Sequence, residues 1–152
     1  MKKIFYLIAL CLMSTLAFSQ TSNQSYDSTL AKRLGADEYG MKMYVFAVLK
    51  TGDNKTENKA FIDSCFSGHL QNIRRLAEKK QIVVAGPFGK NNNQFRGLFI
   101  LNVEKIEDAE MLLKSDPAIS SNLLKAELYP WYGSAALPEY LPFHDKIWKS
   151  NP

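Results

Sequence analysis

The sequence predicts an α+β fold, namely a single ferredoxin-like βαββαβ domain with an antiparallel sheet and both helices on one of its faces. Strand-like and helix-like segments follow one another in the order strand, helix, strand, strand, helix, strand, which is typical of the split βαβ arrangement. The 152 residues are enough for one hydrophobic core and too few for two separate ones. Two helices can cover only one face of such a sheet, so the other face needs a different cover.

Residues 1–19 predict a secretory signal peptide. Two lysines precede an apolar run at residues 4–12, and small residues follow within positions 17–19. The run is shorter than the roughly 20 residues that a spanning helix needs, and no second such run follows it. We therefore expect an exported chain that begins near Gln20, is periplasmic or secreted, and has no stable membrane span.

A flexible lead-in is expected at residues 20–40, because this stretch is rich in polar residues and has no sustained period. Within it, residues 29–34 would form at most one helical turn. The domain itself is expected at residues 41–133. Its first strand, at 41–50, has apolar residues in both alternate sets, so both of its faces should be buried.

A long amphipathic helix should follow, capped by Asn58 or an earlier polar residue and running to about Lys80. His69 lies within its apolar stripe. A buried imidazole must find a partner or change its pKa, so this position needs an explanation. The stripe has spacings of three and four residues and consists of Ile62, Cys65, Phe66, His69, Ile73, Leu76 and Ala77.

The rest of the domain is predicted from periodicity and from turn residues. Asp116 and Pro117 should end the second helix, because proline disfavours helical geometry in the residue before it. A C-terminal tail with several aromatic residues is expected at 134–152. The elements expected after the long helix are a strand at 81–85, a strand at 95–103, a helix at 106–115 and a strand at 123–131.

The face of the sheet without helices would expose Tyr, Phe, Leu and Ile side chains. An apolar patch of this size usually marks an association surface. We therefore expect a homodimer joined sheet to sheet, with the tail covering that joint or a sheet edge.

Charge and motifs exclude several classes of function. The signal contains two of the 19 basic residues and none of the 15 acidic ones, which leaves 17 basic residues against 15 acidic ones in the mature chain. Such a balance gives little support to nucleic-acid binding. The sequence has no Walker loop, GxGxxG, CxxC or HExxH motif, and the AGPFG at 85–89 precedes a strand, as a turn does. We expect no cofactor and no metal.

Cys65 lies four residues before His69 and could form a nucleophile pair with it. A core cysteine is the favoured interpretation, because free cysteine is among the most buried residue types. Cys65 is also the only cysteine after the signal, so no intramolecular disulfide is possible.

His69 and Asp116 form the constellation with potential chemistry. A carboxylate that accepts the imidazole N–H would fix its tautomer and make the other ring nitrogen a competent base. Each residue also has a structural interpretation: His69 as a core histidine bonded to a carbonyl group, and Asp116 as the cap of a helical turn at 117–120. The residues alone favour the structural interpretations.

Three ordered segments form a recognisable pattern, namely HLQNIRRLAEKKQIVVAGPF at 69–88, FRGLFILNVEKIEDAEMLLKSDPAI at 95–119 and ELYPWYG at 127–133. Through them, residues 41–133 resemble the YCII-related (YciI-like) domain family. The resemblance implies a dimeric α+β barrel and a histidine and aspartate pair, here His69 and Asp116, as an active site. One branch of the family resembles dehydrochlorinases of hydroxylated chloroaromatics.

Two functions are therefore expected. In the first, His69 oriented by Asp116 moves a proton on a small organic ligand, in a lyase or isomerase reaction. Arg74, Arg75 and Arg96 would be candidate contacts to an anion. In the second, the protein is a non-catalytic dimeric module for ligand binding or interaction, and its histidine is structural.

Overall fold

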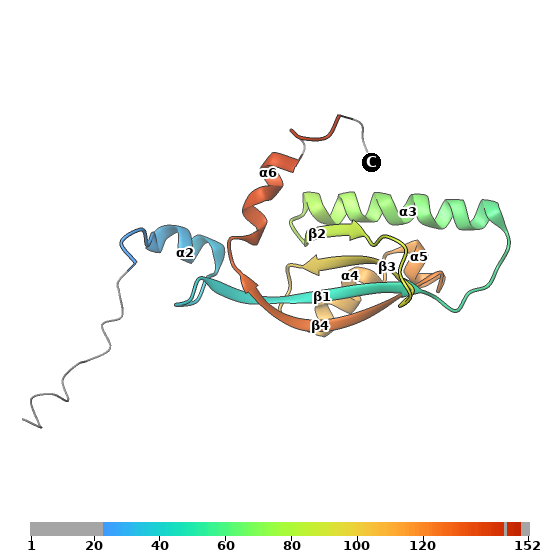
Figure 1. Ribbon diagram of the computed structural model, residues 1–152, viewed down its shortest axis with the longest axis horizontal. Coiled ribbons are helices and arrows are strands. Elements are labelled where there is room, and N and C mark those ends of the chain that lie inside the picture. The colour runs from blue at the N-terminus through green and yellow to red at the C-terminus, as the bar shows by residue number, and fades with distance from the viewer. Residues whose placement is uncertain (1–22, 145, 150–152) are drawn as a thin grey trace, which may run out of the picture.

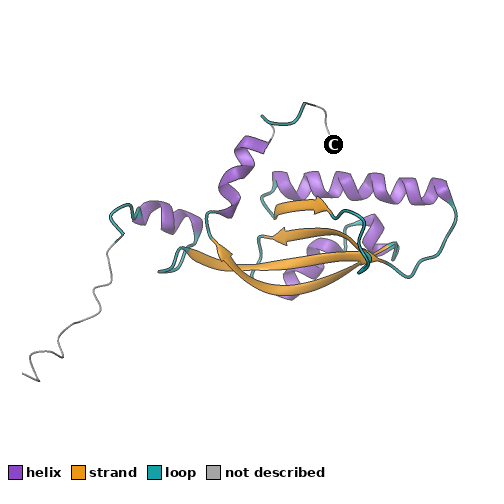
Figure 2. Ribbon diagram, in the orientation of Figure 1, coloured by secondary structure: helices purple, strands orange, loops and turns teal. Residues whose placement is uncertain are grey.

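The structure is a computed structural model that describes residues 23–144 and 146–149, so the signal peptide expected at 1–19 lies outside the described residues. Four strands form one antiparallel sheet in the order β2-β3-β1-β4 (Figures 1 and 2). This α+β architecture agrees with the ferredoxin-like βαββαβ fold expected from the sequence. The elements are α2 Ser28–Leu34, β1 Met41–Thr51, α3 Lys59–Glu78, β2 Ile82–Pro87, β3 Phe95–Leu101, α4 Ile106–Leu113, α5 Pro117–Ser120, β4 Leu124–Ser134, the 3-10 helix η1 Leu137–Tyr140 and α6 Leu141–His144.

The strand β1 lies at the centre of the sheet, where β3 and β4 flank it. Its register pairs Ala47 with Phe99 on one side and with Leu128 on the other. The prediction that both faces of this strand are buried is confirmed, since Tyr44 and Val45 point to opposite faces and both have 0% exposure.

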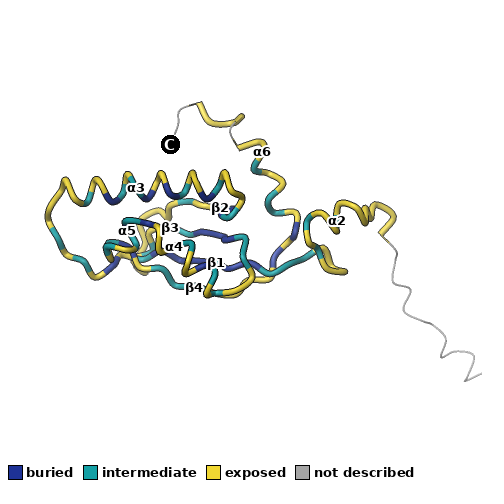
Figure 3. Tube along the Cα trace, turned by 180° about the vertical axis from the view of Figure 1, so that it is seen from behind, coloured by how far each residue is buried: buried dark blue, intermediate teal, exposed yellow. Residues whose placement is uncertain are grey.

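The helices α3, α4 and α5 pack against one face of the sheet. Figure 3 shows the buried positions of α3 on the side of the helix that turns toward the strands. Leu76 of α3, Leu113 of α4 and Ala118 of α5 belong to the same core cluster as Val45 and Leu101 of the sheet. This helix-covered face holds the main hydrophobic core.

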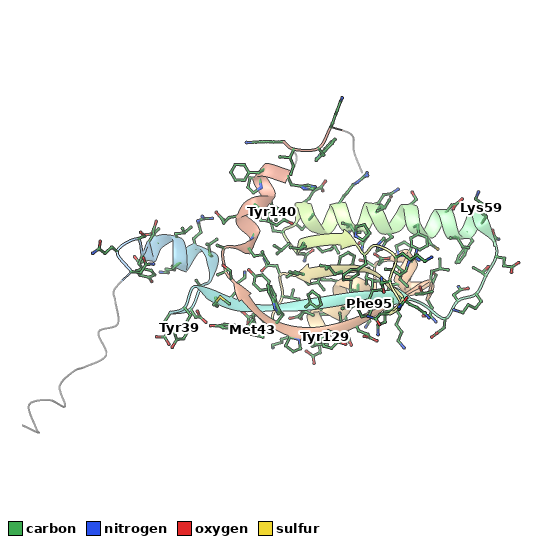
Figure 4. The ribbon with its side chains drawn as sticks, viewed as in Figure 1. Tyr39, Met43, Lys59, Phe95, Tyr129 and Tyr140 are labelled. Carbon is green, nitrogen blue, oxygen red and sulfur yellow. The ribbon has the colours of Figure 1, made fainter. Side chains whose placement is uncertain are left out.

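The other face is covered by η1 at one end. Leu137 of η1 packs against a second, smaller cluster made by Tyr44, Val83 and Ile100. The hydroxyl of Tyr140, labelled in Figure 4, donates a hydrogen bond to the carbonyl oxygen of Val83 in the edge strand β2. The part of the tail that the structure describes therefore covers this open face only partly.

The N-terminal lead-in is more ordered than its composition suggests. The expected single turn is instead α2, a seven-residue helix whose first amides bond to the Asp27 side chain and whose last residue precedes Gly35 in the left-handed conformation. Arg33 of this helix pairs with Glu139 of η1 at 3.0 Å. The segment is therefore anchored to the C-terminal tail.

Several boundaries also differ from those expected. The strand expected at 81–85 is β2 and runs to Pro87, so the first part of the turn expected at 85–89 belongs to the strand, and β3 ends at Leu101 instead of residue 103. The helix expected at 106–115 ends as α4 at Leu113, and Asp116 caps the separate short helix α5, which begins at Pro117. The last strand runs to Ser134 instead of residue 131, because β1 offers pairing partners as far as Met41.

Candidate active site

The structure brings His69 and Asp116 into direct contact. The Nδ1 atom of His69 lies 2.7 Å from Oδ2 of Asp116. His69 is in the middle of α3, whereas Asp116 is the residue before α5 and lies 47 positions later in the chain. The contact expected from the sequence is therefore confirmed, while the role of the pair in catalysis is a separate matter.

A close approach of two helices allows this contact. A Cβ atom added at Gly68 would lie 2.7 Å from the ring of Pro117, a distance that real Cβ atoms essentially never show. Only glycine at position 68 therefore lets α3 approach the start of α5 this closely. Both residues of the site are next to this contact in the chain: His69 follows Gly68, and Asp116 precedes Pro117.

The Asp116 carboxylate is fully buried and accepts four hydrogen bonds. Its Oδ2 atom accepts from His69 and from Nδ2 of Asn72 at 3.3 Å. Its Oδ1 atom accepts from the backbone amides of Ala118 and Ile119, as expected of an N-terminal cap. These four donors match the acceptor capacity of an ionised carboxylate.

Burial and hydrogen bonding act on Asp116 in opposite directions. Burial raises the pKa of the carboxyl group, but the hydrogen bond and the charge of His69, together with the bonds from Asn72 and Ile119, outweigh it and leave the pKa below its ordinary value. Asp116 is therefore an anion at neutral pH.

An anionic Asp116 determines the tautomer of His69. A carboxylate has no proton to donate, so Nδ1 of His69 must carry the hydrogen of this bond. In the neutral imidazole the lone pair is then on Nε2. A base oriented in this way is able to accept a proton from a ligand at Nε2.

The ring of His69 lies between two aromatic residues and is almost buried. Its centroid is 6.2 Å from that of Phe66 and 5.9 Å from that of Phe99, and 8% of the residue is exposed. Within the described part of the chain, His69 bonds through Nδ1, and no buried side-chain nitrogen or oxygen lacks a partner. Because Nδ1 is taken by Asp116, Nε2 is the ring nitrogen left for contact with a ligand.

The other candidates from the sequence do not join this pair directly. Cys65 is buried on the same side of α3, in agreement with the core interpretation. Arg75 contacts Asn72 and Ser115 at the border of the site, and Arg96 lines a hollow at the β2–β3 loop. The described residues contain no group of His, Cys, Asp and Glu side chains arranged to hold a metal ion.

Two hollows are present on the described surface. One, of about 570 Å³, is lined by residues of α4, α5 and β4, and the other, of about 480 Å³, is at the β2–β3 loop. His69 lines neither of them.

Three residues of the site were not singled out in the sequence, namely Gly68, Asn72 and Ser115. Asn72 offered a signal, because it follows His69 by three positions and so shares its helix face. Its 6% exposure is unusual for an asparagine, and buried polar groups need partners. Gly68 gave a weaker signal, a glycine inside a helix.

None of the described helices is long and apolar enough to cross a membrane. No protein-family model matches the chain, and no curated protein matches it. Among solved structures, the chain is similar to 5-chloro-2-hydroxyhydroquinone dehydrochlorinase (TftG) from Burkholderia phenoliruptrix AC1100, in complex with 2,5-dihydroxybenzoquinone. The sequences are 20% identical, the alignment covers 57% of this chain and 92% of that one, and the TM-score is 0.40.

Proposed function

We propose that this protein is an enzyme in which His69 and Asp116 transfer a proton on a small organic ligand. The observation that carries the proposal is the 2.7 Å bond between Nδ1 of His69 and a saturated, buried carboxylate, which leaves the lone pair of the neutral ring on Nε2. The resemblance of residues 69–88 and 95–119 to YCII-related domains points the same way.

The chemistry follows from the orientation of the imidazole. Nε2 takes a proton from a C–H or O–H group of the ligand and becomes part of an imidazolium, whose positive charge Asp116 stabilises through Nδ1. An isomerase returns this proton to another atom of the ligand. A lyase expels a leaving group from the carbon next to the anion, and the proton leaves with that group or with water.

Deuterium incorporation tests the proposal on any compound that binds the protein. A library of small organic acids, enols and phenols is first screened for compounds that raise the melting temperature of the protein. Each hit is then incubated in D₂O with the protein, and proton NMR follows the loss of C–H signals. We expect His69→Gln to abolish the exchange and Gln71→Ala, a neighbouring exposed position on α3, to preserve it.

The alternative is a non-catalytic module whose histidine is structural. The small exposed area of His69 favours this alternative. It predicts a large loss of thermal stability in both His69→Ala and His69→Gln, and no exchange of any bound hit in the wild type. Unaltered melting together with the loss of exchange in His69→Gln would refute it.

We also propose that the protein is exported and forms a homodimer through the open face of the sheet. The support for the dimer is the group of large side chains on that face, in which Tyr129 is 49% and Trp131 37% exposed. Light scattering of the chain beginning at Gln20 tests the dimer, and a monomer at every concentration would refute it. N-terminal sequencing of the protein recovered outside the cytoplasm tests the export.

A further inference from the structure

We infer that Asn72 is a positioning residue, which holds the Oδ2 atom of Asp116 toward His69 and is itself locked in place by Ser115 and Arg75. The inference deepens the proposed function and rests on it only for the use of the pair in proton transfer. The arrangement of these side chains is independent of any ligand.

The two ends of the Asn72 amide have different partners, which fix its orientation. One end of its amide faces Nη2 of Arg75 at 2.6 Å, and the other faces Asp116. A guanidinium has only donors, so the end that meets Arg75 must be the oxygen. The Nδ2 group is then directed at the carboxylate by chemistry alone, which removes the usual ambiguity of an amide side chain.

Asn72 restrains the Asp116 carboxylate together with His69 and the start of α5. His69 and Asn72 both donate to the same oxygen, Oδ2, at 2.7 and 3.3 Å. The backbone amides at the start of α5 hold the other oxygen. With both oxygens held, the carboxylate cannot rotate about its Cβ–Cγ bond without breaking hydrogen bonds inside a closed core, so Oδ2 stays in line with Nδ1.

Arg75 and Ser115 link the buried Asn72 amide to the surface. Arg75 is exposed, and its Nη2 atom also donates to the hydroxyl of Ser115 at 2.9 Å. That hydroxyl lies 3.1 Å from the Asn72 oxygen and 2.8 Å from the carbonyl oxygen of Leu112. The positive charge on one side of the amide polarises its N–H groups on the other, which strengthens the bond to Asp116.

Carbon NMR of selectively labelled aspartate, recorded through acid pH on the ligand-free protein, tests the inference. In Asn72→Leu we expect the proton affinity of Asp116 to rise about tenfold, because the anion loses one charge-assisted hydrogen bond. The proton on Nδ1 of His69 should also exchange faster with water. Gln71→Leu, which removes an exposed amide from the next position of α3, should change neither signal.

Ser115→Ala and Arg75→Met provide milder variants that leave the buried amide in place. Each should raise the proton affinity of Asp116 less than Asn72→Leu does, and neither should add to it in a double variant, since both act through Asn72. Should Asn72→Leu fail to fold, these two variants and their effect on Asp116 decide the matter.

Asn72 would be merely structural if every variant lowered the melting temperature while the titration of Asp116 and the His69 signal stayed as in the wild type. Whether His69→Gln loses the deuterium exchange of a bound ligand bears only on the proposed function. It does not affect the result for Asn72.

Discussion

The two faces of the sheet use alternate residues of the same strands but reach different states of burial. On the helix-covered face, Val45, Leu101 and Phe99 have at most 2% exposure. On the open face, Tyr129 and Trp131 keep more than a third of their surface exposed. Tyr44 on the same face is fully buried, in the cluster against which Leu137 of η1 packs. The first face is complete within one chain, and the second has a cover only at the end where the tail crosses it.

The same contrast holds for the ionised groups. Asp116 is fully buried behind the helix-covered face, where its four bonds are obligatory. Glu127 is placed on the open face by its pairing with Val48, and its partner Lys50 is 2.7 Å away. Both side chains of this second pair are about one-third exposed, so water takes part in their solvation. Two side-chain contacts of equal length are therefore expected to differ greatly in the stability lost when each is removed.

The largest expected difference between the two carboxylates is in the unfolding free energy lost when each is replaced by alanine. Asp116→Ala leaves His69 and Asn72 without their buried acceptor and α5 without its cap, and it should cost about 3 to 5 kcal/mol of unfolding free energy. Glu127→Ala should cost less than about 1 kcal/mol. Urea denaturation of both variants measures the difference, and equal losses would contradict it.

A charge on the open face should affect association more than folding. Tyr129→Glu is expected to weaken the dimer by about 2 kcal/mol, or about 30-fold in its dissociation constant, and to leave the unfolding free energy of the chain within about 1 kcal/mol. Tyr39→Glu, at a position that is 74% exposed and precedes the sheet, is the control. Sedimentation equilibrium measures the dissociation constant of the dimer in both variants. Identical constants would rule out the open face as the interface.

Overpacking at Gly68 should reduce stability on the helix-covered side. Gly68→Ala forces its new methyl group against Pro117 and should cost about 1 to 2 kcal/mol while lengthening the bond between His69 and Asp116. Gly89→Ala has open space around it and should be nearly neutral. Thermal unfolding gives the stability, and the exchange rate of the Nδ1 proton of His69 reports the bond. A Gly68→Ala protein as stable as the wild type would show that α3 and α5 separate without cost.

The smallest expected effect is a change in the acid limb of the stability curve. Because the pKa of Asp116 in the folded state is below its unfolded value of about 3.9, ionisation of this group stabilises the fold above that pH. The stabilisation is lost as the pH falls from about 4 through the folded pKa. Asp116→Asn should therefore lose less stability than the wild type over this interval. Urea midpoints measured at several acid pH values test this, and parallel curves would count against an ionised Asp116.

The elements of the fold were predictable because they depend on neighbours in the chain. Periods of two and of three to four residues located the strands and α3, and the Asp116–Pro117 dipeptide gave the start of α5. The early end of the helix expected at 106–115 was not predictable, since no glycine or proline marks Leu113 as its last residue. The length of β4 depended on pairing with β1, which is a property of the sheet.

By itself, the sequence determined the order of the elements, the position of His69 in a buried stripe and the capping role of Asp116, since each depends on residues within about four positions. Only the tertiary structure decided that these two side chains lie 2.7 Å apart, that Asn72 shares the same carboxylate oxygen, and that Gly68 makes the approach possible. Local periodicity fixes which face of a helix is buried. The distance between two buried side chains from separate helices depends on how closely those helices pack, and here the volume of one missing methyl group sets that distance.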